Sequence, residues 1–231
     1  DVREYLREDG SSPYQEWFNR LDSLAAAKVA TAQKRLEQGN TSSIKWLDGI
    51  GEYRIDWGPG YRIYLVQDGK QLIVLFGEAQ KKGNSQILIK PKSYTKTINN
   101  EERSEKISKP GRIEQEAKKK ESTAMTLTRD SRETIHARLQ YDSEFAIALL
   151  DEAVYLFLNG EPETARLILR DLVNATVGFE HLATATSKPS KSLHRMLSAK
   201  GNPTMDNLTT IFNVLRKELH VDIRVQTVPC I

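Results

Sequence analysis

Residues 178–204 read GFEHLATATSKPSKSLHRMLSAKGNPT, and this stretch decides the fold of the C-terminal part of the chain. Apolar residues mark the inner side of a short helix over residues 178–186 and of a second helix over residues 190–198. The intervening TSKP segment has the composition of a turn, and Ser190 is a good first residue for the second helix. The stretch therefore predicts a helix-turn-helix, whose second helix fits the major groove of DNA.

Basic and polar side chains mark the outer side of this second helix and its flanks. The candidates for contacts with DNA phosphates or base edges are Lys188, Ser190, Lys191, Ser192, His194, Arg195 and Asn202. The alternative is a plain helical bundle whose polar side is only solvated, because the same helix pair occurs in proteins that do not bind DNA. The pattern by itself leaves both interpretations open.

The residues around this pair predict a mostly helical module. Further helices are expected over residues 130–140, 144–159, 162–174 and 205–220. Residues 221–227 alternate apolar and polar side chains, which predicts a short terminal strand.

This module resembles the HigA-type addiction-module antidotes. The resemblance rests on the run from Gly178 to Ser198 and on the Gly-Asn-Pro-Thr step at residues 201–204, and it covers nearly all of residues 125–228. It implies an antitoxin that binds its toxin domain, in cis or in trans. It also implies repression of its own promoter through operator DNA, as a homodimer.

The N-terminal residues 1–77 predict a separate α+β unit, with one helix and an antiparallel sheet. A strand at residues 2–7 and one amphipathic helix over 13–37, ended by Gly39, come first. A meander of strands at residues 52–57, 61–67 and 72–76 follows, joined by the turn sequences GPG and DGK.

The first hairpin of this meander carries the chemistry. If the GPG turn at residues 58–60 closes it tightly, Arg54 lies opposite Tyr64 and Asp56 lies opposite Arg62. Such a cationic face could hold an RNA phosphate during attack by a 2′-hydroxyl, a reaction that needs a base, a proton donor and cations. The alternative is an ordinary cross-strand ion pair on a solvated face.

Residues 47–64, LDGIGEYRIDWGPGYRIY, are similar to the RelE/ParE superfamily, in particular to its HigB-like killer proteins. The likeness covers residues 2–77. It implies a ribosome-dependent mRNA endonuclease, with ribosome and mRNA as partners, although some relatives poison gyrase instead. By this resemblance the catalytic candidates are Arg62 and Arg54, followed by Lys45 and Tyr64.

Residues 78–124 are richer in Lys and Arg than in Asp and Glu and predict an irregular basic linker, with a short helix at residues 113–120. Killer proteins of this type continue instead with a Gly-Gly-x-Lys … Asp-Ile-x-x-Ala tail. A one-nucleotide shift over residues 78–92, with permitted codons, restores such a tail. The hypothesis is a frameshift that truncates the toxin, leaves the strand at 72–76 as a bare edge and continues into an antidote gene starting at Met125. The alternative is an evolved linker.

Composition limits the remaining classes. The chain has 231 residues, a net charge of +3 and one cysteine, Cys230, so we expect no internal disulfide, no metal site and no cofactor. No apolar run reaches the length of a membrane span, and the chain starts at Asp1 without a signal peptide, so we expect a cytoplasmic protein with no membrane partner. Because the net charge is small, nucleic-acid binding has to rest on local patches.

The predicted organisation is a fused toxin–antitoxin chain: a truncated toxin domain at residues 1–77, a linker at 78–124 and an antitoxin domain at 125–231. Its N-terminal half is expected to be an impaired mRNA endonuclease. Two alternatives stay open, an active mRNA interferase inhibited in cis and a toxin-capturing protein with no role on DNA.

Overall fold

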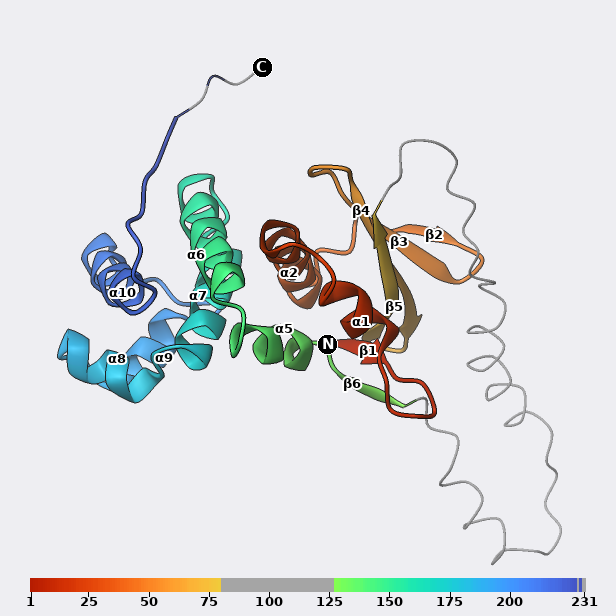
Figure 1. Cartoon of the computed structure of the whole chain (residues 1–231), viewed down its shortest axis with the longest axis horizontal. Helices are drawn as coiled ribbons and strands as arrows, with labels where there is room; N and C mark the ends of the chain where they lie inside the picture. The colour runs from red at the N-terminus through yellow and green to blue at the C-terminus, as the bar shows by residue number, and fades with distance from the viewer. Residues whose placement is uncertain (80–126, 228, 230–231) are drawn as a thin grey trace, which may run out of the picture. The chain divides into compact units, whose positions relative to one another are not determined.

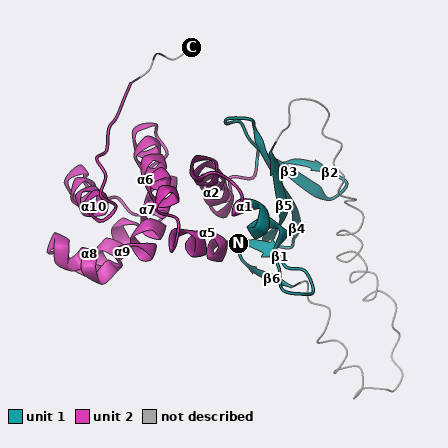
Figure 2. Cartoon of the chain, viewed as in Figure 1, with its two compact units in different colours: residues 1–17, 42–131 teal, residues 18–41, 132–231 magenta. Residues whose placement is uncertain are grey.

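The computed structural model describes residues 1–79, 127–227 and 229, and it is an α+β structure with a mixed sheet and several helices (Figure 1). The chain forms two compact units (Figure 2). Unit 1 joins residues 1–17 to 42–131, and unit 2 joins residues 18–41 to 132–231. Each unit therefore takes residues from both halves of the chain, whereas the sequence predicted division at residues 77 and 125.

Unit 1 is built on one sheet with the strand order β2-β3-β4-β5-β1-β6. The strands are β1 (Val2–Tyr5), β2 (Lys45–Leu47), β3 (Ile50–Ile55), β4 (Tyr61–Asp68), β5 (Gln71–Ala79) and β6 (Thr128–Asp130). Strands β2 to β5 form an antiparallel meander, which confirms the sequence prediction for β3 to β5. Strand β1 is parallel to β5, and β6 is antiparallel to β1.

Strand β5 is not the bare edge that the sequence led us to expect. It lies between β4 and β1, because Val2, Arg3 and Glu4 pair with Leu72, Ile73 and Val74. That expectation was wrong because the parallel pairing of β1 brings together residues about 70 positions apart, which no local pattern reveals.

Helix α1 (Pro13–Phe18) fixes one part of the sheet through a close contact between Trp17 and Gly77. A Cβ atom on Gly77 would lie 2.3 Å from the Trp17 ring, so the indole needs a residue without a side chain beneath it. The same ring meets Tyr61 edge-on at 6.5 Å. Elsewhere in the sheet Val66, Ile73 and Leu75 form a buried cluster. The site residues are therefore carried by a packed sheet.

The single helix predicted over residues 13–37 was wrong, because the structure has two: α1 and α2 (Ser23–Glu37). Asp22 starts the second one, since its side chain accepts a hydrogen bond from the backbone N–H of Ala25. Gly39 follows α2 with a φ of +86°, which confirms its predicted role in ending the helix.

Unit 2 is helical, and six of its helices lie close to where the sequence predicts them. They are α5 (Arg132–Leu139), α6 (Ser143–Leu158), α7 (Pro162–Ala175), α8 (Phe179–Thr186), α9 (Ser190–Met196) and α10 (Met205–Glu218). Helix α2 packs against α6 and α7 in the same unit. The alanines of α2 are buried, and so are Phe145, Leu149 and Leu156 of α6 and Ile168 and Leu172 of α7.

The terminal strand predicted at residues 221–227 was wrong. These residues follow α10 without forming a strand, and among the described residues no strand of the sheet pairs with them. Asp222 is instead hydrogen-bonded to Arg216 at 2.7 Å. Alternation makes a segment suited to a sheet, but a strand also needs a neighbour that accepts its hydrogen bonds.

Other expectations concern single properties of the chain. No helix among residues 1–79 and 127–227 is long and apolar enough to cross a membrane. The same residues hold no group of His, Cys, Asp and Glu arranged to bind a metal ion. The predicted helix at residues 113–120, the start at Met125 and Cys230 lie outside the described residues.

Candidate functional site

The first candidate site is one face of the sheet, where β3 and β4 pair. Arg54 lies opposite Arg62, and Glu52 lies opposite Tyr64. The predicted register, with Arg54 opposite Tyr64 and Asp56 opposite Arg62, was therefore wrong by two residues. A shift of two keeps every side chain on its predicted face, because side chains alternate with a period of two.

The register differs because the connection is longer than the GPG turn. Strand β3 ends at Ile55, and the loop is closed by hydrogen bonds from Trp57 N to Ile55 O and from Gly60 N to Trp57 O, both within 3.0 Å. Gly60 has a φ of +80°, which this loop requires and which favours glycine. Asp56 is thereby removed from the sheet, and it does not pair with Arg62.

Two carboxylates flank the central cation of this face. Arg62 Nε lies 3.6 Å from Glu52 Oε2, and its Nη1 lies 3.7 Å from Glu78 Oε1. The Arg62 side chain is only 15 % exposed, and its Nε atom has no hydrogen-bond partner among the described residues. The two carboxylates therefore neutralise the charge of the guanidinium, but they lie too far from it to accept hydrogen bonds from its N–H groups.

Tyr64 is held by the same two carboxylates. Its hydroxyl donates to Glu78 at 2.8 Å and lies 3.3 Å from Glu52, while its ring stacks on Phe76. Burial, the hydrogen bond to Glu78 and the nearby negative charges raise the pKa of the Tyr64 phenol above its ordinary value. Tyr64 is therefore a proton or hydrogen-bond donor at neutral pH and not a base.

The outer cations of this face are Arg54 and Lys45. Arg54 Nε donates to Glu52 at 2.5 Å, and its side chain is 47 % exposed. Lys45 is exposed on β2, opposite Glu52. The structure thus places all four predicted residues on neighbouring strands of one sheet face, but with two carboxylates among them, so the face is not purely cationic.

Sequence reasoning did not identify Glu52 and Glu78 as part of this site. Glu52 was placed on the correct face, but no role followed from its position. Glu78 lies beyond the predicted end of the last strand, whereas β5 continues to Ala79 and brings Glu78 opposite Arg62. The signal that could have identified Glu78 is strand alternation: if the strand continues past Phe76, then Phe76 and Glu78 lie on the same face as Tyr64 and Arg62 of the neighbouring strand.

The second candidate site is the pair of helices α8 and α9, which begin and end close to the predicted residues. Ser187, in the connection, has a φ of +51°, and Lys188 N donates to Ala183 O at 3.1 Å to close the turn. Leu182, Leu193 and Leu197 are fully buried, as predicted. The inner sides of the two helices therefore pack together and direct the other side of α9 outward.

The predicted DNA-contacting residues differ in exposure. Lys191, Arg195 and Asn202 are exposed, and Lys188, Ser190, Ser192 and His194 are half-buried. Among the residues that the structure describes, the cations of α9 have no carboxylate partner within ion-pair distance. His194 stacks on Phe179 with ring centroids 3.7 Å apart, so its ring is a packing element as well as a polar group.

The Gly-Asn-Pro-Thr step fixes how α9 is followed by α10. A Cβ atom on Gly201 would lie 2.2 Å from the backbone oxygen of Met196, so the chain can pass the end of α9 only with glycine there. Thr204 then caps α10 by accepting a hydrogen bond from Asn207 N. Arg166 of α7 donates to the carbonyls of Ser198 and Ala199 at 3.1 and 2.7 Å, which anchors the end of α9.

A third feature is the contact between the two halves of the chain inside unit 1, which we name the sheet seam and define as β1, β6 and Ser131. Arg3 donates to Thr128 Oγ1 and to its carbonyl at 2.8 and 2.9 Å. Ser131 Oγ donates to Val2 O at 2.9 Å. Main-chain pairing thus joins residues 2–5 to residues 128–131.

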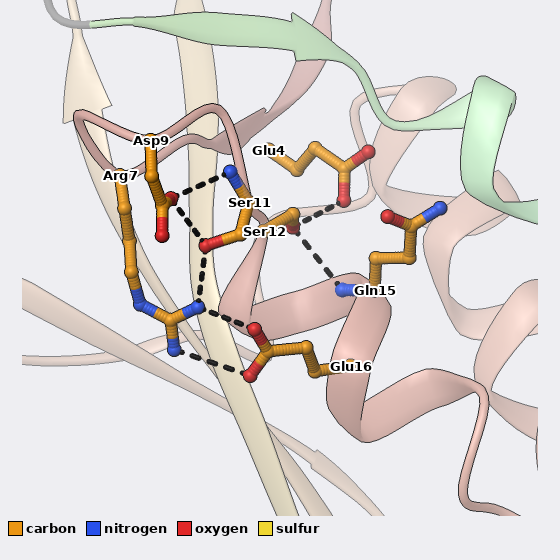
Figure 3. Close-up of polar contacts among 7 residues, drawn as sticks. All are labelled: Glu4, Arg7, Asp9, Ser11, Ser12, Gln15 and Glu16. Carbon is orange, nitrogen blue, oxygen red and sulfur yellow. Dashed lines mark hydrogen bonds and ion pairs between the residues drawn. The ribbon is translucent and has the colours of Figure 1, made fainter.

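Glu4 is the charged centre of the sheet seam and is fully buried. Arg129 Nε donates to Glu4 Oε1 at 2.5 Å, and Ser12 Oγ donates to Glu4 Oε2 at 2.7 Å. Figure 3 shows Ser12 between Glu4 and the backbone N–H of Gln15, close to the surface pair of Arg7 and Glu16. We interpret this cluster as structural, because Glu4 joins Arg129 of β6 to Ser12 ahead of α1, and Arg7, which follows β1, pairs with Glu16 of α1.

The corresponding contact inside unit 2 is the helix seam, which we define as residues 18–38 against α5, α6 and α7. Charged pairs cross it along the length of α2: Lys28 with Glu152, Lys34 with Asp171, and Arg35 with Glu161. The Arg35 pair is bidentate, at 2.8 and 2.7 Å. Each pair joins a cation of the N-terminal half to a carboxylate of the C-terminal half.

Arg138 is the buried anchor of the helix seam. Its guanidinium donates to Phe18 O at 2.6 Å, to Leu21 O at 2.8 Å and to Asp142 at 2.9 Å. The Phe18 and Phe145 rings lie 5.4 and 5.0 Å from its central carbon. One side chain of the C-terminal half thus caps the carbonyls at the end of α1 and orients Asp142, which starts α6.

Comparison with known proteins gives one partial match. A 64-residue stretch, 27 % of this chain, is 44 % identical to an uncharacterized protein of Haemophilus influenzae. The match covers 65 % of that protein's length. No protein-family model matches the chain, and no solved structure matches it. The chain is therefore similar, over about a quarter of its length, to a bacterial protein that is described only as uncharacterized.

Proposed function

We propose that this chain is a fused type II toxin–antitoxin protein. Its C-terminal half binds operator DNA and neutralises toxin, and its N-terminal half is an impaired mRNA endonuclease. The observation that carries the proposal is that residues on either side of segment 80–126 pack together twice, in the sheet seam and in the helix seam. The N-terminal half of such a chain is bound by its own C-terminal half.

Neutralisation is supported by the character of the two seams. Strand addition at β6 and the row of complementary charges on α2 are features typical of recognition between two proteins. Here they occur between residues of one chain, at high effective concentration, because the two halves are covalently joined. A toxin domain on a separate chain, with the same β1 and α2 sequences, would bind in trans to the same surfaces of the C-terminal half, namely β6 and helices α5 to α7.

DNA binding is supported by α9 and its flanks. Lys191 and Arg195 are one helical turn apart and exposed, which places two cations side by side on the surface of the helix. The packing of Leu193 and Leu197 and the close contact at Gly201 hold this surface in one orientation. A rigid, basic helix surface after a tight turn is what a major-groove reader needs.

Impairment of the nuclease half is supported by the sheet face. Arg62 and Tyr64, two of its proposed phosphate-contacting groups, are engaged by Glu52 and Glu78. We favour this over the alternative of an active mRNA interferase inhibited in cis, because the carboxylates reside on the same sheet as the cations. The toxin-capturing protein without a DNA role is the second alternative, and the exposed cations of α9 argue against it.

The first prediction tests DNA binding with the full chain. A gel shift on the DNA upstream of its own gene should give a retarded band, and Lys191→Ala/Arg195→Ala should weaken binding by about 30-fold or more, since two contacts are lost at about 1–3 kcal/mol each. The fragment 125–231 is unsuitable, because it lacks α2 and with it part of the unit 2 core.

Lys45→Ala/Arg54→Ala is the matched control, because it removes the same charge from the sheet face and should leave the shift unchanged. If both double variants weaken the shift equally, the binding is nonspecific and the operator role is lost. If the unaltered chain gives no shift at low salt, the toxin-capturing alternative is preferred.

A further inference from the structure

Three cations and two carboxylates share the sheet face of unit 1: Lys45, Arg54 and Arg62 with Glu52 and Glu78. Their arrangement is not that of simple surface pairs. Arg62 lies between the two carboxylates, at 3.6 and 3.7 Å, and both distances are longer than a hydrogen bond. Its Nε has no hydrogen-bond partner among the described residues although it is buried. The guanidinium thus keeps donors that a better-placed anion could use.

Tyr64 points to the same position. Its hydroxyl donates to Glu78 at 2.8 Å, so one Glu78 oxygen lies near both the phenol and the Arg62 guanidinium. A phosphate oxygen bound at this point would accept from the same two groups. The Glu78 carboxylate therefore occupies the position in which a phosphate group of a ligand could bind to Arg62 and Tyr64.

The two carboxylates differ in how firmly they are held. Glu52 is inside β3, accepts from Arg54 at 2.5 Å and is 20 % exposed. Glu78 is the second-last residue of β5, is 25 % exposed and, within the part of the chain that the structure describes, forms no ion pair with Arg54. Of the two, Glu78 is the one that can leave its position with the smaller change to the sheet.

We propose that Glu78 acts as a resident anion that occupies the phosphodiester subsite formed by Arg62 and Tyr64, and that removing its charge opens this subsite to single-stranded RNA. The inference rests on the proposed function, since it concerns the regulation of the same nuclease-like face. It predicts that removing the charge of this one residue raises the affinity of the chain for single-stranded RNA.

The test measures binding of a fluorescent single-stranded RNA octamer by anisotropy, using full chains that all carry Lys191→Ala/Arg195→Ala, so that the α9 surface does not contribute. Adding Glu78→Gln, which keeps the shape and removes the charge, should tighten binding about tenfold, as expected for loss of one nearby like charge at a screened surface. Asp68→Asn makes the same charge change at the exposed end of β4 and should have no more than a small effect. Inorganic phosphate should compete with the RNA in the Glu78→Gln variant.

Arg62→Ala in the Glu78→Gln background should abolish the gain, and a thermal melt of each variant establishes that the sheet is intact. Glu78→Ala serves as a second opening variant should Glu78→Gln unfold. The proposal is overturned if chains with and without Glu78→Gln bind the RNA with equal affinity. It is also overturned if the higher affinity persists when Arg62→Ala is added. So does RNA cleavage by the unaltered chain that Glu78→Gln abolishes, because Glu78 would then be a catalytic base. Operator binding is measured separately, with chains that retain Lys191 and Arg195. A negative RNA result therefore does not affect the DNA result, and a negative DNA result does not affect the RNA result.

Discussion

The sheet seam and the helix seam join the same two halves of the chain by different means. The sheet seam uses main-chain pairing over three residues, side-chain hydrogen bonds from Arg3 and Ser131, and the buried ion pair of Arg129 with Glu4. The helix seam uses side chains, with three charged pairs along α2 and the Arg138 anchor. Main-chain hydrogen bonds tolerate sequence change, whereas paired charges depend on each partner and on pH, so we expect the helix seam to be the more sensitive of the two.

The largest expected effect comes from breaking the helix seam at Arg138. Arg138→Ala leaves the carbonyls of Phe18 and Leu21 without their donor and Asp142 without its cation, so the free energy of unfolding of unit 2 should fall by about 3–5 kcal/mol. Hydrogen exchange measured by mass spectrometry would report it as faster exchange in α2 and α6. Arg216→Ala, at an exposed pair with Asp222, is the control and should change exchange little. Exchange that stays unchanged in α2 would mean that Arg138 does not hold the seam.

Breaking the sheet seam at Arg129 should have a smaller effect. Arg129→Ala removes one partner from the buried Glu4, but Ser12 still donates to that carboxylate and the β1–β6 main-chain pairing persists. The expected loss is about 2–3 kcal/mol, confined to unit 1 and visible as faster exchange in β1 and β6. Arg129→Ala/Glu4→Gln, which also removes the buried negative charge, should recover part of it. A loss equal to that of Arg138→Ala would erase the proposed difference between the seams.

The smallest expected effect is the loss of helix-seam stability in acid, where the carboxylates of its charged pairs become protonated. Burial raises the pKa of the Asp171 carboxyl, but the His136 ring, whose Nε2 lies 3.3 Å away, and the Lys34 ammonium outweigh burial, and the pKa of Asp171 lies below the ordinary 3.8. The Asp142 pKa is also lowered, since the Phe145 N–H and Arg138 outweigh burial. A carboxyl with a lowered folded pKa adds stability above the unfolded value and loses it as pH falls through the folded one.

The stability that Asp171 and Asp142 contribute to unit 2 should therefore be constant from neutral pH to about pH 5 and be lost as the pH falls below about 4. Lys34 does not change this acid profile. Burial lowers the pKa of its ammonium, but Asp171 and Glu37 raise that pKa by more, so the stability that Lys34 contributes is lost only above the ordinary pKa of 10.5. Denaturant melts with exchange readout at several pH values would measure the slope. Asp171→Asn should flatten it, and a slope that Asp171→Asn leaves unchanged would assign the acid effect to other carboxyls.

Local sequence determined most of the elements of this protein. The alternation in β4, the periodicity of α6, α7 and α10, and the short connection between α8 and α9 are each set within a few residues, so pattern reasoning found them. It also placed Arg54, Arg62 and Tyr64 on one face, because strand alternation does not depend on register.

Only the tertiary structure decided which elements lie together. The parallel pairing of β1 with β5, the addition of β6 to β1 and the packing of α2 against α6 and α7 join residues separated by about 70 to 140 positions. The same holds for Glu78, whose position against Arg62 follows from the continuation of β5. Periodicity reports which side of an element is buried, but not against what it is buried, because that choice depends on complementary surfaces far apart in the chain.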